Sequence, residues 1–581
     1  MRVVKSSSAV FAALLVVAIA SIAPGLGVAT LWEPDEPRFA EATRQMFERG
    51  DFLTPYFNGV PRFEKPILLY WLQAIAYAAL GPTELAARLP VAVMGIGTVL
   101  VLYLLGAAIA SPRAAFVAAL ALATMFRFVA MSRQGLTDVP VVFFITVAMY
   151  GFVRSVTTPS RAAPWLAWSA VGLGVLTKGP VGLLPVAVWA AYAAARRDGQ
   201  LVARVRPIAG AIVAMVIAVP WYAMMIVEHG RAFVDFAIGH EIVNRVMSER
   251  EFAPMRGFLY YFKVWPGDAA PWSIMLMAAL AWSAHRWWSL RPDDRRAIVL
   301  AITWFFGVFF IFSMSRSKVP HYVLPAYPAA ALLIGVFVDR AAGPTRVSAS
   351  RGTGHSRDVW WWRAPISAVA GVVLIAAVML GWSLDVLMPA ANVAARLVLP
   401  VVLALGGVGI GVAAWRSAPI AATTALALTL AAAFAVIGAE IVPGAIEAFK
   451  PMPQLARTAA RLAPPGARIG LVGRYGASSV IFYSHHNIEW LDDDEATLTF
   501  MTSHPDALCV IPSSDIERLT PRLPPSAHIV DAGEEFNVRF ERLLERRRSE
   551  GRRWVLLALT NDERRTKNEE RQRGMGEPFV P

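Results

Sequence analysis

The segment from Leu31 to Trp71 carries more chemically capable side chains than any other stretch of the chain. Closely spaced acids alternate with prolines, and the segment ends in Glu64-Lys65-Pro66 before a run of aromatic residues. The acids of its first part fall within one expected helical stretch and are Glu33, Asp35, Glu36, Glu41 and Glu48. A loop that only joined two apolar segments would not need this set, so we take it as a candidate catalytic site.

The spacing of apolar residues predicts a helix over 37–50, with Pro37 at its first position. Asp35 and Glu36 then stand at its N-terminus, where free N–H groups and the helix dipole stabilise carboxylates. Capping alone accounts for both acids, so a structural and a catalytic role stay open.

This expected helix is amphipathic, which predicts that it lies on a membrane surface. A second surface helix is expected after Lys65-Pro66. The apolar face of the first helix would carry Phe39, Ala42, Thr43, Met46 and Phe47, and the polar face Arg38, Glu41, Gln45 and Glu48.

Composition identifies a polytopic α-helical membrane protein. The chain has 581 residues, of which 56% are hydrophobic and 17% charged, and a mean hydropathy of +0.50, outside the range of soluble globular proteins. The net charge of +13 is explained by basic cytoplasmic loops, so no nucleic-acid partner is expected. The single cysteine, Cys509, cannot form an intrachain disulfide.

About 20 apolar residues are needed to cross a bilayer, and this criterion predicts about thirteen transmembrane helices, with twelve to fourteen open. The first apolar run exceeds that of a cleaved signal, so we read it as an uncleaved anchor with its N-terminus inside. The candidates are 8–31, 89–110, 114–130, 136–153, 163–177, 179–195, 207–227, 260–284, 297–315, 319–338, 364–384, 396–415 and 417–439.

This topology places arginine-rich loops on the cytoplasmic side, yet the opposite side also keeps many basic residues. Positive charge retained against the insertion bias suggests a bound anionic substrate, although any single cation could instead pair with a neighbouring acid or lipid phosphate. The residues concerned are Arg38, Arg44, Arg49, Arg62, Lys65, Arg127, Arg133, Lys178, Arg231, Arg245, Arg250, Arg256, Lys263, Arg316 and Lys318.

The pattern divides the chain into a membrane domain, 1–445, whose first outer loop is 32–88, and a second domain over 446–560. Short apolar runs at 469–472, 480–483, 508–511 and 554–557 predict a small α/β domain there, which thirteen spans place outside. Its glycines Gly470, Gly473 and Gly476 do not match a dinucleotide fingerprint, so no nucleotide is expected. Residues 561–581 are expected to be disordered.

Several motifs, in order over residues 30 to 330, resemble those of the polyprenyl-phosphate-sugar glycosyltransferases of the GT-C superfamily, which is related to protein O-mannosyltransferases. Within that family the similarity is greatest to the bacterial members that transfer aminoarabinose to lipid A. The sequence departs from the pattern at Phe39, where a tyrosine is usual, and at Ile67, where a proline is common. The motifs are Trp32-Glu33-Pro34-Asp35-Glu36-Pro37-Arg38-Phe39-Ala40-Glu41, Gly50-Asp51, Phe63-Glu64-Lys65-Pro66, Leu176-Thr177-Lys178-Gly179-Pro180 and Ser317-Lys318-Val319-Pro320-His321-Tyr322-Val323-Leu324-Pro325.

The resemblance implies a GT-C fold with about thirteen transmembrane helices, periplasmic juxtamembrane helices and a small periplasmic C-terminal α/β domain. It also implies inverting transfer of 4-amino-4-deoxy-L-arabinose from undecaprenyl phosphate to a phosphate of lipid A, by a monomer in the inner membrane of a Gram-negative bacterium. Less negative lipid A would then imply resistance to polymyxin and cationic peptides.

The resemblance marks Asp35 as the catalytic carboxylate, and we include Glu36 and Asp138 with it; whether Asp35 orients the acceptor, stabilises the anomeric centre or binds the sugar amine stays open. The leaving polyprenyl phosphate gains negative charge, which lysine and arginine can stabilise. Lys65 and Lys178 are the first candidates. Further candidates for phosphate or carrier binding are Arg38, Arg245, Arg256, Lys318 and Tyr322.

Glu64 and His321 are candidate ligands for a divalent metal, zinc, magnesium or manganese, although a hydrogen-bonding role for His321 is the simpler alternative. Two other functions stay open. One is a related lipid-linked-sugar transferase with a protein or another glycan as acceptor, and the other is a transporter or flippase. Transport is disfavoured because the expected charges gather at one membrane face and no repeat is evident.

Overall fold

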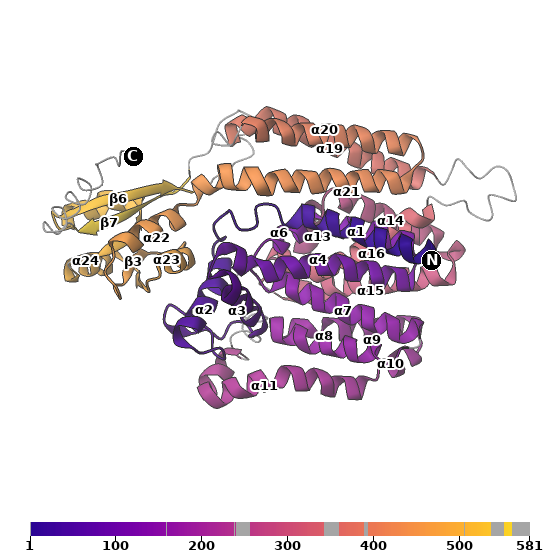
Figure 1. Ribbon diagram of the computed structural model, residues 1–581, viewed down its shortest axis with the longest axis horizontal. Helices are drawn as coiled ribbons and strands as arrows, with labels where there is room; N and C mark the ends of the chain where they lie inside the picture. Colours follow the sequence, from indigo (N-terminus) through magenta and orange to yellow (C-terminus); the bar gives the residue numbers. More distant parts are fainter. Residues whose placement is uncertain are drawn as a thin grey trace, which may run out of the picture.

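A computed structural model describes residues 2–158, 160–237, 239, 256–315, 317–341, 359–387, 393–504, 506–535 and 551–559. Long helices run side by side, and a smaller domain containing a sheet sits at one end of the bundle (Figure 1). We call that end of the bundle the domain end. The predicted polytopic helical fold is confirmed.

Within the described ranges, nine helical stretches are long and apolar enough to cross a membrane, and a tenth is added if α5 and α6, which meet at a 64° bend, form one span. The protein is therefore a multi-pass membrane protein. The helices of the bundle are α4 (Glu84–Ile109), α5 (Pro112–Ala123), α6 (Phe126–Ser132), α7 (Asp138–Thr157), α8 (Ala163–Lys178), α9 (Leu184–Arg196), α10 (Gln200–Arg204), α11 (Pro207–Val234), α15 (Pro292–Met314), α16 (Tyr327–Ala341), α19 (Trp360–Leu387), α20 (Val393–Trp415) and α21 (Pro419–Val436).

Not every predicted span has full length. Helix α1 (Arg2–Ile22) ends nine residues before the predicted 31, and its described apolar part is only Ser8–Ile22. The predicted span 260–284 is divided into α13 (Tyr260–Asp268) and α14 (Trp272–Arg286), because Pro271 before α14 cannot donate a backbone hydrogen bond. The count of thirteen stays a prediction.

Residues 163–196 form one of the nine helical stretches counted above. Within this stretch the chain folds back on itself. The ring of Phe152 on α7 contacts both Trp168 on α8 and Trp189 on α9, with ring centroids 5.7 and 5.4 Å away. The two tryptophans therefore lie at the same level, and the chain reverses at the 3-10 turn Gly179–Leu183. The stretch accordingly contains both helices predicted for it.

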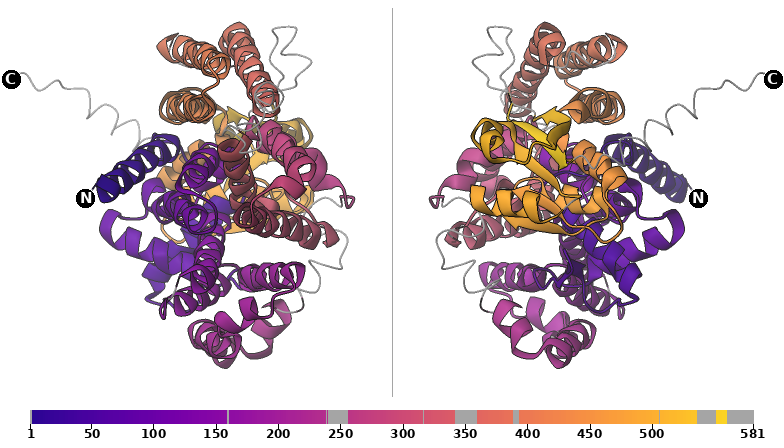
Figure 2. Two further views of the ribbon diagram at one scale, coloured as in Figure 1. Left: turned by 90° about the vertical axis from the view of Figure 1, so that its right-hand side faces the viewer. Right: turned by 90° about the vertical axis from the view of Figure 1, so that its left-hand side faces the viewer.

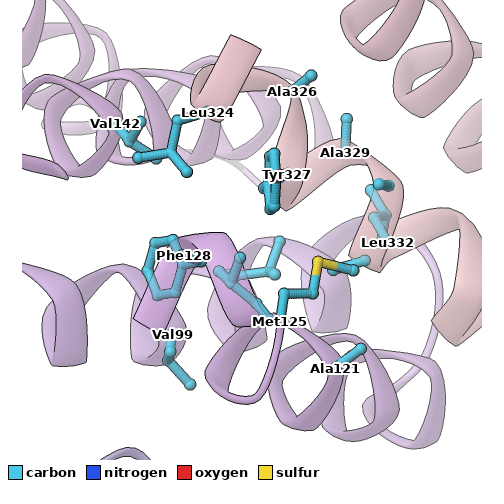
Figure 3. Packing of buried hydrophobic residues seen from close by; sticks show 14 of the residues in the cluster. Val99, Ala121, Met125, Phe128, Val142, Leu324, Ala326, Tyr327, Ala329 and Leu332 are labelled. Carbon is cyan, nitrogen blue, oxygen red and sulfur yellow. The ribbon is translucent and has the colours of Figure 1, made fainter. Parts of the chain in front are cut away.

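Small residues allow the helices to approach closely. Helix α5 is rich in buried alanine, and a Cβ added at Gly335 on α16 would lie 2.2 Å from the carbonyl oxygen of Ala114. Larger side chains such as Phe128, Met125 and Tyr327 fill the space where these helices meet α4 and α7 (Figure 3). Small interfacial residues are how helices associate in lipid, where no hydrophobic driving force acts between them.

Apolar side chains also point outward from the bundle. Ile208 and Val227 on α11 and Val378 on α19 are 81%, 86% and 71% exposed, as expected of side chains that face lipid. Figure 2 shows α19, α20 and α21 as a group at one side of the bundle. Helix α21 continues through the π-helical segment Ile437–Ile446 and the 3-10 turn Glu447–Phe449 into the C-terminal domain.

The C-terminal domain contains a five-stranded sheet with strand order β4-β3-β5-β7-β6. Strands β4, β3 and β5 are parallel to one another. Strand β7 is antiparallel to both of its neighbours, β5 and β6. The predicted strand-like run 480–483 is wrong, because it lies in a helix, α23. The elements are α22 (Pro451–Leu462), β3 (Ile469–Val472), α23 (Ala477–Ser484), β4 (Ile488–Leu491), α24 (Asp494–Ser503), β5 (Leu508–Pro512), α25 (Ser513–Leu519), β6 (Ala527–Glu534) and β7 (Arg553–Leu559). The expected disordered tail, 561–581, lies outside the described residues.

Candidate active site

The acid-rich segment folds into α2 (Asp35–Arg49), a short hairpin of β1 (Tyr56–Phe57) and β2 (Val60–Pro61), and α3 (Leu68–Leu80). Helix α3 lies where a second helix was predicted. Helix α2 begins two residues before the predicted Pro37, and Gly50 ends it with a φ of 66°. That left-handed conformation costs glycine little, which explains the stop.

The predicted polar surface of α2 is partly wrong. Glu41 and Gln45 are buried, because α2 packs against α23 of the C-terminal domain. The Glu41 carboxylate accepts hydrogen bonds from Arg44 at 2.6 and 2.8 Å and from Gln45 at 2.7 Å. Burial nevertheless raises the pKa of Glu41. Sequence amphipathicity could not reveal this, since the covering helix lies more than 400 residues away.

A cavity of about 330 Å³ opens beside this segment, within the range of small-ligand sites. Lys65 and Lys178 lie in its wall together with Glu64, so the loop after β2 and the end of α8 meet here. Most of the remaining wall is apolar or aromatic: Phe63, Pro66, Pro180, Val181, Leu184, Trp221, Tyr222, Phe233, Ala237, Ile311 and Phe312. The cavity can therefore hold an anionic group attached to an apolar one.

Lys178 is held by Asp138, the first residue of α7. Its Nζ lies 2.7 Å from Oδ1 of Asp138 and 5.3 Å from the ring centre of Tyr322. His321 is next to the same carboxylate, with Nε2 3.9 Å from Oδ1. The structure thus brings Asp138, Lys178, His321 and Tyr322 together from three helical regions, and Asp138 fixes the direction of the lysine ammonium.

Glu64 forms an ion pair with Arg62 at 2.8 Å. The positive charge of Arg62, with Lys65 beside it, lowers the pKa of Glu64 from its ordinary 4.5 to about 2. The guanidinium of Arg62 also lies over the ring of Phe39, 4.5 Å from its centre, in a cation–π contact. Lys65 donates to the carbonyl of Glu64 at 2.9 Å. This cluster is thus a preformed, charged end of the cavity.

Asp35, the first residue of α2, is half exposed and lies 4.0 Å from Arg38. It is not among the residues that line the cavity, yet its charge acts on His321 and on Arg62. Arg38 donates to Oγ of Ser478 in the C-terminal domain at 3.1 Å. Asp35 therefore stands at the edge of the charged cluster, accessible to a ligand.

Glu36 occupies a different position from Asp35. Its carboxylate is buried and binds Arg88 of α4 through two hydrogen bonds of 2.7 and 2.9 Å. It also accepts the backbone N–H groups of Trp32 and Gly135, both at 2.8 Å. Through these bonds Glu36 connects α2 to α4. A catalytic role for Glu36 stays a prediction, and the burial of its carboxylate does not favour that role.

Among the remaining predicted cations that the structure describes, Lys318 and Arg256 do not line the cavity. Lys318 is buried, and its ammonium donates to the carbonyl oxygens of Arg256 and Ser315. The guanidinium of Arg256 lies 4.3 Å from the ring centre of Tyr260. Arg245 is outside the described residues. Substrate binding by these three residues stays a prediction.

The predicted metal at Glu64 and His321 also stays a prediction. Among the described residues, no group of three or more His, Cys, Asp or Glu side chains is arranged to hold a metal ion. Glu64 is engaged by Arg62, and the carboxylate beside His321 is engaged by the ammonium of Lys178. Cationic groups therefore take the places where a cation would bind, and this donor set does not fit a metal.

Sequence reasoning missed the aromatic wall of the cavity. Trp221 and Tyr222 lie inside an apolar run, where composition does not separate a lipid-facing ring from one that lines a site. Arg88 was missed as well, although a charged residue at the start of an apolar run is a signal of function or of a buried partner. That partner is Glu36.

Comparisons with known proteins agree with this arrangement. Residues 6–232 match the family model described as dolichyl-phosphate-mannose-protein mannosyltransferase. An uncharacterized protein of Aquifex aeolicus is 31% identical over 54% of this chain and 61% of its own length. The undecaprenyl phosphate-alpha-4-amino-4-deoxy-L-arabinose arabinosyl transferase of Pseudomonas aeruginosa is 29% identical over 52% of this chain. The chain spans 55% of that relative.

The structural similarity covers more of the chain than the sequence similarity does. The crystal structure of ArnT from Cupriavidus metallidurans bound to undecaprenyl phosphate superposes with a TM-score of 0.71 and covers 96% of this chain and 98% of that one, at 24% identity. The bundle and the C-terminal domain are thus arranged as in that protein. The first part of the chain is thus similar in sequence to the dolichyl-phosphate-mannose-protein mannosyltransferases, and the fold is shared with the Cupriavidus protein.

Proposed function

We propose that this protein is an inverting glycosyltransferase that moves 4-amino-4-deoxy-L-arabinose from undecaprenyl phosphate to a phosphate of lipid A. The cavity carries the proposal, because Lys65 and Lys178 line it together with an aromatic and apolar wall. A polyprenyl phosphate has the same two parts, an anion and a long apolar chain. The name of the Pseudomonas aeruginosa relative supports the choice of sugar and carrier.

The reaction would take place at the periplasmic face of the inner membrane of a Gram-negative bacterium. An oxygen of the acceptor phosphate attacks the anomeric carbon from the side opposite the leaving group. The bond from that carbon to the carrier phosphate breaks, and its electron pair leaves with the polyprenyl phosphate. Lys65 and Lys178 would stabilise the negative charge that grows on this group, and Asp138 would keep Lys178 directed at it.

The acceptor phosphate is already an anion, so the reaction needs no strong general base. The exposed carboxylate of Asp35 would orient the acceptor, stabilise the positive anomeric centre or bind the sugar amine. Added aminoarabinose would make lipid A less negative, which implies resistance to polymyxin and cationic peptides.

Mass spectrometry of lipid A tests the proposal directly. In a strain that makes the donor, lipid A should gain an aminopentose when this chain is expressed and lack it when the gene is deleted. An unchanged lipid A profile in both strains, with the donor present, would refute the proposed acceptor.

Site variants test the assigned residues in the same strain. Lys65→Ala and Asp35→Asn should abolish the modification, while the protein still inserts into the membrane at normal levels. The control is Lys263→Ala, because Lys263 is an exposed lysine that does not line the cavity. Full activity of Lys65→Ala and Asp35→Asn would contradict the roles that we assign to Lys65 and Asp35.

A protein acceptor is the second candidate. The matched family model describes mannosyltransferases that act on proteins, and the same cavity would serve a mannosyl donor. Glycoproteomic comparison of the two strains would then show hexose on envelope proteins, with lipid A unchanged.

A further inference from the structure

A second cavity, of about 250 Å³, lies between the segment before α2 and the C-terminal domain. It shares no lining residue with the cavity that holds Lys65 and Lys178, and the proposed transfer does not use it. Its lining residues are Leu31, Trp32, Glu33, Ile446, Phe449, Lys450, Pro451, Met452, Pro453, Tyr475, Ser479 and Glu535. We call it the junction cavity.

Glu33 gives the junction cavity an unused polar atom. The residue is partly buried, and one carboxylate oxygen, Oε1, accepts the backbone N–H of Ser479. The other oxygen, Oε2, is buried and has no hydrogen-bond partner. A buried acceptor without a donor destabilises the folded protein, and more strongly when the acceptor is charged. The position therefore favours a ligand that donates a hydrogen bond.

The charged residues that line the junction cavity indicate which kind of hydrogen-bond donor would bind there. Glu535 is a second carboxylate in the wall, and Lys450 is the one cation among the described residues that line the cavity. The ammonium of Lys450 is already engaged by the carbonyl of Thr30 at 2.5 Å and by Glu447 at 3.4 Å. It also lies 4.4 Å from the ring centre of Trp32. The two carboxylates thus leave excess negative charge in the wall.

Neighbouring groups agree with that charge. Burial raises the pKa of Glu33, while the hydrogen bonds from Ser479 and the charge of Arg38 act in the opposite direction. Burial, together with the charges of Glu535 and Glu33, raises the pKa of Tyr475 to about 12. Tyr475 therefore stays neutral, and it provides an aromatic surface at the cavity beside Trp32.

We propose that the junction cavity binds a primary amine on a group no larger than a monosaccharide, with the ammonium donating a hydrogen bond to Oε2 of Glu33. The cavity has room for a group of this size, and one positive charge would compensate the unpaired carboxylate. Such an amine could belong to a carbohydrate or to a lipid headgroup. The site is built from both domains, so binding also holds them together.

Ligand-observed NMR on the full-length protein in nanodiscs tests the proposal. The probe is 6-amino-6-deoxyglucose, and its matched control is glucose, which has a hydroxyl in place of the ammonium. The amine should bind at least about tenfold more tightly than glucose, because a charge-assisted hydrogen bond is worth about 1.5–3 kcal/mol. Equal binding of the two sugars, or no binding of the amine, would overturn the proposal.

Two carboxylate variants locate the binding. Glu33→Gln keeps the shape of the side chain and removes its charge, so affinity for the amine should fall by about tenfold or more. If that variant does not fold, Glu535→Gln gives the same test at the second lining carboxylate, with a smaller loss expected. The control, Glu495→Gln, changes a carboxylate that is 72% exposed on α24 and should bind like the wild type. Unaltered affinity in a folded Glu33→Gln protein would contradict the site.

Two further measurements complete the test. Affinity of the wild type for the amine should fall as pH decreases and Glu33 becomes protonated, while Glu33→Gln should show a weaker dependence that comes from Glu535. Ethanolamine in place of the amino sugar distinguishes a headgroup source from a carbohydrate source by which of the two binds more tightly. Binding is measured without donor or acceptor, so these outcomes do not depend on whether the proposed transfer is correct.

Discussion

Lys178 and Asp138 lie 40 residues apart in sequence, yet their charged atoms are 2.7 Å apart at the cavity. Both are largely shielded from solvent. A shielded ion pair constrains direction more reliably than it adds stability, because desolvation offsets much of the attraction. We therefore regard Asp138 as a positioning residue for Lys178.

This assignment predicts the effect of Asp138→Asn. The amide keeps the shape but cannot balance the ammonium, so we expect sugar transfer to fall about 10- to 100-fold, with the larger effect on KM for the lipid donor. Asp294→Asn is the matched control. Asp294 also binds a cation, Arg340 at 2.9 Å, but Arg340 does not line the cavity, whereas Lys178 does. Equal loss in both variants would indicate a general effect on folding instead.

Glu64 predicts a pH dependence of stability. Its pKa is lowered to about 2 in the folded protein, so its ion pair with Arg62 contributes fully above the unfolded pKa near 4.5. That contribution is lost as pH falls from there through 2. Thermal unfolding midpoints in detergent should show Glu64→Gln below the wild type at pH 6, with the difference shrinking towards pH 3. A constant difference would contradict this ion pair.

At the scale of elements, the turn between α8 and α9 decides where Lys178 lies. Lys178 is the last residue of α8 and is followed by Gly179, whose φ is 57°. The turn then packs against the end of α8, so that a Cβ added at Gly182 would lie 2.2 Å from the backbone nitrogen of Val175. The cavity depends on this close approach, which only glycine permits.

Gly182→Ala should therefore separate the turn from α8. We expect a destabilisation of about 1–3 kcal/mol and a loss of donor binding, since Lys178 moves with the turn. Unfolding midpoints and donor affinity measure the two effects. The control is Gly371→Ala on α19, where an added Cβ meets no atom within 4 Å. There alanine favours the helix by up to about 1 kcal/mol.

At the scale of the whole molecule, the C-terminal domain is attached to the first loop by specific polar contacts. Asn58, in the β1–β2 turn, donates to the carbonyl of Ile488 at 3.1 Å and accepts its N–H at 2.7 Å. Tyr483 accepts the N–H of Leu31 at 2.8 Å and donates to Glu84 at 3.1 Å. These contacts join the first loop to the C-terminal domain at two separate places.

Asn58→Gly tests this attachment. Asn58 has a φ of 53°, so glycine removes both hydrogen bonds without straining the backbone. Hydrogen exchange followed by mass spectrometry should show faster exchange at the start of β4, with about 1–3 kcal/mol less protection. Gln454→Ala removes a bond to Asp531 within the domain and should leave β4 unchanged. Unaltered exchange in Asn58→Gly would show that the domain is held by other contacts.

The sequence by itself determined the membrane class and the second helix of the acidic segment, because hydropathy and proline positions act over short distances. Only the tertiary structure decided which charges have partners. Glu36 and Asp35 are neighbours in sequence. Glu36 is buried in an ion pair with Arg88, whereas the side chain of Asp35 is half exposed.

The same holds for the acidic segment as a whole. Its amphipathic pattern predicted a water-facing side for α2, but the C-terminal domain covers Glu41 and Gln45 and encloses the unpaired oxygen of Glu33. Such contacts join residues hundreds of positions apart, so the spacing of apolar residues along the sequence cannot predict them. The fold alone therefore decided that this segment contributes to two cavities, one through Glu64 and Lys65 and the other through Glu33.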